Sequence, residues 1–133
     1  MRRGFSSLTV LLSLLMSTAL AQDFAKVAPN NVKVEIDNHD VRILRVHYGP
    51  HDKTAMHGHP DHVIVFLTDN HTKHTFADGT TKELQSKAGQ VVWRPALKHA
   101  VENLSDQPFD VIEIELKGKA TAYAATTKPG SGQ

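Results

Sequence analysis

Hydrophobic and polar residues alternate along much of the chain after residue 31, which is the pattern of β-strands with one buried face. Apolar and charged side chains take turns through residues 32–37, and residues 41–48 are rich in β-branched and aromatic types. Gly49-Pro50 ends the second of these expected strands. The run 62–68 is apolar at successive positions, so it predicts a strand covered on both faces, in the interior of a sheet.

Further strands are predicted later in the chain, each bounded by turn residues: 71–77, 80–84, 90–94, 99–104 and 112–116. Asp78-Gly79 has the chemistry of a hairpin turn. In the last strand Ile112, Ile114 and Leu116 face one way, while Glu113 and Glu115 face the other. No helical pattern follows residue 21, and residues 22–31 are expected to form an irregular arm. About nine or ten short strands separated by turns predict an all-β sandwich or barrel.

Residues 1–21 combine Arg2-Arg3, an apolar run and the ending Ala19-Leu20-Ala21, which is typical of a secretory signal peptide. We expect cleavage after Ala21 and an exported protein, either periplasmic or secreted. A stable membrane anchor is disfavoured, because Ser and Thr interrupt the run and it is shorter than the roughly 20 residues that span a bilayer. Residues 119–133 predict a disordered tail by their composition, which leaves 22–118 as one folded domain.

The charge balance excludes some classes of partner. Removing residues 1–21 takes away two of the 15 basic residues and none of the 14 acidic ones, so the rest of the chain has 13 against 14. Nucleic acid and anionic membrane surfaces both require clustered Lys and Arg, so neither is an expected partner. The chain has no cysteine, so a folded exported form has no disulfide to stabilise it.

Three histidines, His57, His59 and His62, stand within six residues at the start of the apolar run. On a strand His57 and His59 share a face and can reach one cation, and a bend at Pro60-Asp61 would bring His62 to their side. One histidine alone is most often an ordinary polar residue, and a cluster in a solvated loop is the plain alternative. The apolar strand that follows favours a metal site instead.

A second segment carries Gly89, Pro95, His99 and Asn103, with five residues between the first two and three between the last two. Together with the His57-x-His59 pair, it resembles the two motifs of the cupin superfamily, over residues 49–103. The resemblance implies a single antiparallel cupin-type β-barrel, also called a double-stranded β-helix or jelly roll. Since such barrels often dimerise through sheet extension, it also implies a homodimer.

The first motif departs from the family pattern, since no Glu follows His59 at the usual distance and Val63 stands there. Aligning the apolar run instead puts His62 in place of the Glu. The resemblance then implies a metal bound by four imidazoles, with a net charge near +2 where a Glu would give +1. Neutral nitrogen ligands suit one divalent transition metal, Fe, Cu, Ni, Zn or Co. The implied ligands are His57, His59, His62 and His99.

The resemblance implies a metal-binding protein, and the expected function is a metal-dependent oxidoreductase, dioxygenase-like, that acts on a small anionic or enolic molecule. The alternative is a non-catalytic module that holds a metal or small ligand in the cell envelope, and a third reading is a barrel without metal. No catalytic residue is assigned, since the missing Glu removes the obvious general base.

Four other residues near the motifs have milder predicted roles. We expect Trp93 to be packed and Arg94 to be solvated, although either could line the pocket, Arg94 then as an anion clamp. Asp61 and Glu102 are the acids nearest in sequence to the histidines and are candidates for orienting an imidazole.

Overall fold

The computed structural model describes residues 22–118, so the predicted signal peptide, its cleavage site and the predicted tail 119–133 lie outside the described residues. Within the described part nine strands follow one short helix, α1 (Phe24–Val27). The strands are β1 (Val32–Asp37), β2 (Val41–Tyr48), β3 (His57–His59), β4 (His62–Phe66), β5 (Asn70–Phe76), β6 (Thr81–Ser86), β7 (Val91–Arg94), β8 (Leu97–Asn103) and β9 (Phe109–Leu116). No helix in residues 22–118 is long and apolar enough to cross a membrane.

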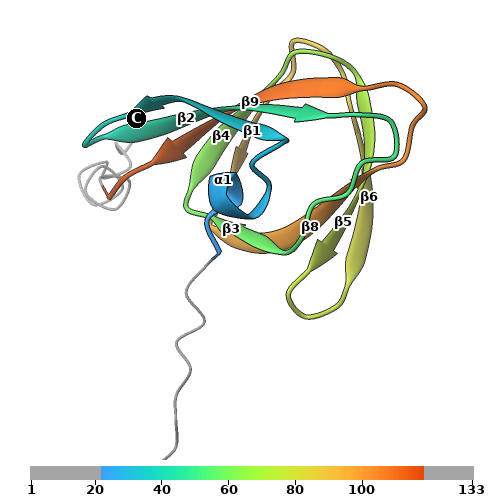
Figure 1. Ribbon diagram of the computed structural model, residues 1–133, viewed down its shortest axis with the longest axis horizontal. Helices are drawn as coiled ribbons and strands as arrows, with labels where there is room; N and C mark the ends of the chain where they lie inside the picture. The colour runs from blue at the N-terminus through green and yellow to red at the C-terminus, as the bar shows by residue number, and fades with distance from the viewer. Residues whose placement is uncertain (1–21, 119–133) are drawn as a thin grey trace, which may run out of the picture.

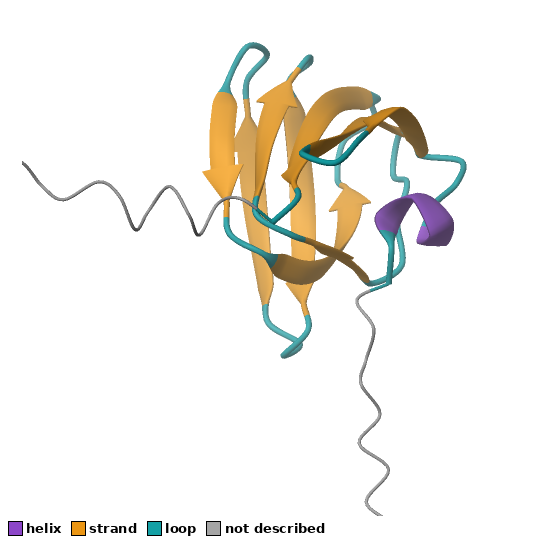
Figure 2. Ribbon diagram, turned by 90° about the vertical axis from the view of Figure 1, so that its left-hand side faces the viewer, coloured by secondary structure: helices purple, strands orange, loops and turns teal. Residues whose placement is uncertain are grey.

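The strands form two antiparallel sheets that curve around a shared interior (Figures 1 and 2). One sheet has the order β1-β2-β9-β4-β7 and the other the order β3-β8-β5-β6. The predicted all-β architecture is therefore confirmed. Strand β4 lies between β9 and β7, as its apolar sequence predicted.

Helix α1 corrects the expectation of an irregular arm at residues 22–31. The Asp23 side chain caps the helix by accepting a hydrogen bond from the Lys26 backbone N–H at 3.1 Å. Phe24 is buried against the strands, with 1% of its surface exposed. One turn is too short to show a helical period, so its cap and one buried ring, rather than a sequence pattern, define it.

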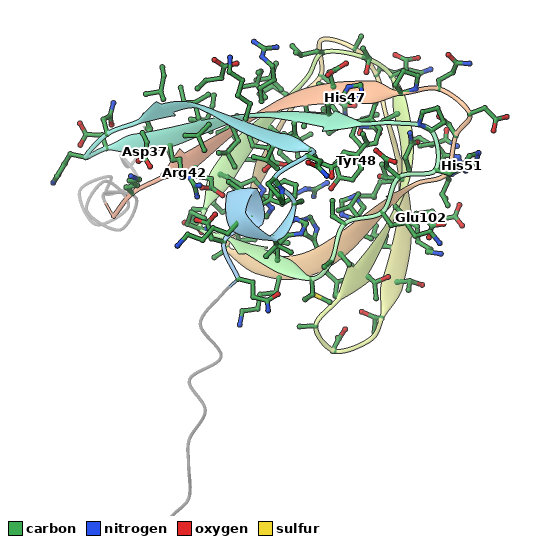
Figure 3. All side chains as sticks on the ribbon, viewed as in Figure 1. Asp37, Arg42, His47, Tyr48, His51 and Glu102 are labelled. Atoms are coloured by element: carbon green, nitrogen blue, oxygen red, sulfur yellow. The ribbon has the colours of Figure 1, made fainter. Side chains whose placement is uncertain are left out.

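The apolar core lies between the sheets and is centred on β2 and β9. Leu44 and Val46 of β2 are fully buried, and the rings of Tyr48 and Phe109 stack with their centroids 4.7 Å apart. Figure 3 shows Tyr48 pointing into the interior. The core thus occupies one part of the interior and leaves the region near β3 and β8 to polar side chains.

Strand β9 alternates as predicted, and the structure shows which face is buried. Phe109, Val111, Glu113 and Glu115 face the interior. The partly exposed side chains of Ile112, Ile114 and Leu116 face outward. Two carboxyl groups therefore enter the interior on the strand that also supplies its apolar core.

Gly79 and Asn103 stabilise a turn and a strand end. Gly79 has φ of 84°, the left-handed conformation that glycine adopts without strain, and it lies in the turn between β5 and β6. The fully buried Asn103 side chain donates hydrogen bonds to the carbonyls of Gly49 and Gln107, at 2.9 and 2.8 Å. These bonds satisfy backbone carbonyls beside the end of β8.

Candidate metal centre

Three of the four predicted ligands converge in the interior. His57 and His59 face the same way on β3, and β3 pairs with β8 so that His57 lies opposite His99. One ligand nitrogen from each of the three imidazoles lies within 4.8 Å of the others. All three side chains are buried. Antiparallel pairing between β3 and β8 thus joins two segments about 40 residues apart in sequence into one group.

His62 begins β4 in the other sheet, beyond the bend at Pro60-Asp61. The bend is held by the Asp61 carboxylate, which accepts a hydrogen bond from the Ala96 backbone N–H at 2.8 Å. The His62 ring is 1% exposed and its centroid lies 4.8 Å from that of His59. It adjoins the three-histidine group without belonging to it, and its part as fourth ligand stays a prediction.

Hydrogen bonds give three of the imidazoles the same orientation. The Nδ1–H of His57 donates to the Ala55 carbonyl at 2.8 Å, and the Nδ1–H of His62 donates to the Pro60 carbonyl at 2.8 Å. The Nδ1–H of His59 donates to Glu115 Oε1 at 2.9 Å. Since Nδ1 carries the proton in each ring, the lone pair of the neutral imidazole is on Nε2.

The Nε2 atoms of His57 and His59 are buried and have no hydrogen-bond partner among the described residues. A buried acceptor without a partner costs roughly 1–3 kcal/mol. Two such atoms in one group fit a cation, because a metal ion accepts both lone pairs at once. The residues present therefore fit a divalent transition metal bound through His57, His59 and His99.

Two carboxylates stand behind His59, and sequence reasoning missed both. Glu115 accepts the hydrogen bond of His59 Nδ1, and Glu113 Oε2 lies 3.3 Å from the same nitrogen. His59, Glu113 and Glu115 form a second group in which three ligand atoms lie within 4.8 Å of one another. The signal was available in the sequence, because both acids have the same parity on β9 as Phe109 and Val111.

These carboxylates change the expected electrostatics of the site. Four imidazoles alone would leave a bound divalent metal with a net charge near +2, but the Glu115 carboxylate lies one hydrogen bond behind His59, and Glu113 lies 3.3 Å from the same nitrogen. A carboxylate on Nδ1 raises the basicity of an imidazole ligand and fixes its orientation. Arg42 balances part of this charge, since its Nη1 lies 3.7 Å from Glu115 and it forms two hydrogen bonds to Asp23.

His99 is oriented by a different partner. Its Nδ1 lies 3.0 Å from Nδ1 of His74 on β5, and Nε2 of His74 lies 3.1 Å from Thr72 Oγ1. If His99 presents Nε2 to the metal, its Nδ1–H donates to His74, and His74 in turn donates to the Thr72 hydroxyl. One consistent chain of hydrogen bonds then runs from the group to β5.

Helix α1 covers one side of the group. The Phe24 ring stacks on His57 with centroids 3.8 Å apart and an interplanar angle of 6°, and it meets His59 edge-on at 5.2 Å. In Figure 1 α1 lies directly beside β3. An apolar ring at this position keeps water from the imidazoles on that side.

Four of the milder predictions can be checked against the structure. Trp93 is 56% exposed, so the expectation that it is packed is wrong, and Arg94 lines the interior instead of being simply solvated. On β7, Val92 and Arg94 face inward, so Trp93 between them faces outward. Asp61 holds the bend, and Glu102 pairs with Lys53 and Lys73, so neither orients an imidazole.

Burial governs the pKa values of the imidazoles. It lowers the pKa of His57 to about 4, and burial together with the nearby imidazoles lowers the pKa of His99 to about 2. Burial also tends to lower the pKa of His59, but Glu113 and Glu115 outweigh it and the pKa is raised. Burial raises the pKa of the Glu113 carboxyl. At neutral pH His57 and His99 are therefore neutral and able to bind a cation.

Acidification from about pH 7 to about pH 5 is expected to destabilise the metal-free protein. The pKa values of His57, His62, His74 and His99 are all lowered by burial from 6.5. Below about pH 6.5 the unfolded chain gains protons that the folded chain does not, so stability present above that pH is lost on the way down. His59 and Glu113 act in the opposite direction but are fewer. Urea unfolding of metal-free protein at both pH values checks this, and equal or greater stability at the lower pH would contradict it.

Comparison with solved structures places the fold. The chain is similar to a cupin domain from Bordetella pertussis Tohama I, with 31% sequence identity, a TM-score of 0.62, and coverage of 65% of this chain and 92% of that one. A protein with a double-stranded β-helix domain from Klebsiella pneumoniae matches with 22% identity, a TM-score of 0.54, and coverage of 67% and 77%. An RmlC-like cupin family protein from Methanocaldococcus jannaschii matches with 13% identity, a TM-score of 0.52, and coverage of 69% and 84%. No protein-family profile and no curated protein sequence matches the chain.

Proposed function

The chain belongs to the cupin superfamily, and from that premise we propose that it is a metal-dependent, dioxygenase-like enzyme that acts on a small anionic or enolic molecule. The observation that carries this proposal is that a pocket reaches the histidine group. This pocket is partly open to solvent, and His57 and His99 line it. A small molecule in this pocket would meet the imidazole group, which is what a catalytic metal site requires.

The residues have separate roles in this proposal. His57, His59 and His99 would hold the metal, with His62 as the fourth ligand. A bound divalent transition metal would supply Lewis acidity and, for iron or copper, redox chemistry. Glu115 and His74 orient the ligands His59 and His99, and Phe24 excludes water from one side. The apolar wall of the pocket would hold the body of the substrate.

Metal analysis of protein purified without an affinity tag tests the metal. We expect close to one equivalent of a single transition metal per chain. Less than about a tenth of an equivalent, judged against the tight binding typical of protein metal sites, would count against the site. The control is the same protein after dialysis against a chelator and reloading.

The His62→Ala variant tests the four-imidazole version of the site. We expect weaker metal binding, because His62 lies beside His59 in the interior and would supply one of the four nitrogens. His71→Ala is the matched control, since the His71 ring contacts Glu83 on the surface. Metal content and affinity that stay at wild-type values in His62→Ala would leave a three-imidazole site.

Oxygen uptake by the metal-loaded protein, measured with a panel of enolic and phenolic compounds, distinguishes a dioxygenase-like enzyme from a non-catalytic binding protein. We expect uptake with at least one compound of the panel. No oxygen uptake with any compound of the panel, measured with fully metal-loaded protein, would favour the non-catalytic alternative, a module that holds a metal or small ligand in the cell envelope. The burial of all three ligating imidazoles is the observation that favours this alternative, because structural metal sites are closed.

The place of the protein in the cell and its assembly are part of the proposal. Export follows from the signal-like pattern of residues 1–21, and a homodimer follows from the family resemblance. Detection of the protein starting at Gln22 in an extracellular or periplasmic fraction would support export. Protein that retains Met1 in the cytoplasm would contradict it.

A further inference from the structure

The pocket that reaches the histidine group has an apolar wall. Its lining includes Tyr48 and Phe109, whose rings stack, together with Ile64, Phe66, Val101 and Val111. These side chains come from both sheets and belong to, or pack against, the core of the protein. Asn70, Thr72 and Ser86 add a few polar groups to the lining, but most of it is apolar, so a ligand body that fills this space has to be largely hydrocarbon.

A second pocket adjoins the first and shares part of its lining. The two share Ile64, His74, Leu84, Arg94 and His99 in their linings. The second pocket is also lined by Lys82, and no carboxylate among the described residues lines it. Both linings are mostly apolar, and the second adds the cationic side chain of Lys82 to the shared Arg94.

Arg94 lies at the junction of the two pockets, because it lines both of them. Its inward direction follows from β7, where Val91 and Trp93 take the outer face with 61% and 56% of their surface exposed. Arg42 and Arg45 are held by carboxylates, at 2.6 Å from Asp23 and at 3.0 Å from Glu35. Within residues 22–118, no carboxylate forms an ion pair with Arg94. Its guanidinium is therefore free to bind an anion from solution.

We propose that Arg94 binds the carboxylate of the substrate, so that the site selects small monocarboxylic acids with an apolar, aromatic or branched aliphatic body. The inference rests on the proposed function, because that function places the reaction in the same pocket. Anion binding by Arg94 can nevertheless be measured with or without turnover. A planar guanidinium matches a carboxylate with two parallel hydrogen bonds, which a lysine ammonium cannot form. His99, in the same two linings, brings the bound acid next to the metal ligands.

The charged residues that line the first pocket explain why a ligand with one carboxylate is preferred over a ligand with two. Glu113 is the acid that lines this pocket among the described residues, and its side chain is buried there. Beyond Arg94 and the metal site, the lining offers no cation to receive a second carboxylate, which would lie in an apolar space beside Glu113. A dicarboxylic acid whose second carboxylate cannot reach the metal should therefore bind more weakly than a monocarboxylic acid.

Binding of defined acids to the metal-loaded protein, measured by calorimetry, tests the proposal. The probes are phenylpyruvate and phenylacetate, with phenylacetamide as the uncharged analogue and succinate as the dicarboxylate. Wild-type protein is expected to bind the two aromatic acids at least about tenfold more tightly than the amide or succinate, as hydrogen bonds to a charged group allow. Arg94→Gln is expected to weaken binding of the acids about 10- to 100-fold and to leave binding of the amide unchanged.

Two further variants make the result specific. Arg94→Lys keeps the charge and loses the planar fork, so it is expected to recover only part of the affinity. Arg45→Gln removes an arginine whose guanidinium pairs with Glu35, and it should bind the acids like wild type. Equal affinity of wild type and Arg94→Gln for the acids would overturn the proposal, as would a wild-type protein that binds neither acid. Arg94-dependent binding in a metal-loaded protein that consumes no oxygen would uphold the anion site and refute the enzyme.

Discussion

The His59→Gln variant is expected to bind divalent transition metals at least about a hundredfold more weakly than wild type, because loss of an outer hydrogen-bond partner alone costs about 10- to 100-fold. His59 is central to the site in two ways. Its buried Nε2 has no hydrogen-bond partner in the described chain, and its Nδ1 is held by Glu115 at 2.9 Å. Glutamine removes the lone pair directed at the metal.

The same change also leaves Glu113 and Glu115 in the interior without the imidazole. These two residues are 7% and 4% exposed, so the metal-free variant should unfold more easily than the metal-free wild type. Metal affinity and unfolding of the metal-free protein are therefore measured separately, by competition with a chromophoric chelator and by urea titration.

His47→Gln is the matched control for this variant. His47 also contacts a carboxylate through Nδ1, Asp110 at 3.0 Å, but its side chain is 56% exposed. It should change neither metal affinity nor stability appreciably. A folded His59→Gln protein that binds metal like wild type would show that the ligands lie elsewhere.

The Phe24→Ala variant is expected to lose about 3–5 kcal/mol of unfolding free energy, the usual cost of removing a buried phenyl ring. Phe24 is 1% exposed and stacks on His57, and a backbone bond from the Gly58 N–H to the Gln22 carbonyl at 2.9 Å anchors the segment before it. Without the ring, α1 has no other fully buried side chain to fix it against β3. Water would then reach His57.

Urea unfolding of the metal-free protein measures this loss. Leu67→Ala serves as the control, because Leu67 is 42% exposed and its truncation should cost about 1 kcal/mol or less. Phe24→Leu should fall between wild type and Phe24→Ala. A loss from Phe24→Ala no greater than that from Leu67→Ala would mean that α1 contributes little to the fold or to the cover over the imidazoles.

Much of the fold could be predicted because strand alternation is a local signal. Residues 32–37 and 41–48 form strands with the predicted bounds, and the bend at Pro60-Asp61 separates β3 from β4. Pairing of His57 with His99 followed only from the resemblance of two motifs, since no local pattern shows which strands will be neighbours.

The features that were missed depend on tertiary contacts. Glu113 and Glu115 read as the polar face of an ordinary strand, and only their shared parity with Phe109 and Val111 indicates that they turn inward. Arg94 was expected to be solvated because charged residues usually are, but β7 places it on the inner face. In each case the parity of the residue on its strand, which tertiary packing fixes, turns a charged side chain inward.

X-ray absorption spectroscopy of the metal-loaded wild-type protein tests the central claim most directly, because it counts the imidazoles bound to the metal. A site formed by His57, His59, His62 and His99 predicts four imidazole nitrogens and no protein carboxylate in the first shell. The group of His59, Glu113 and Glu115 offers the competing arrangement. A first shell with one imidazole and two carboxylates would place the metal there and contradict the histidine site.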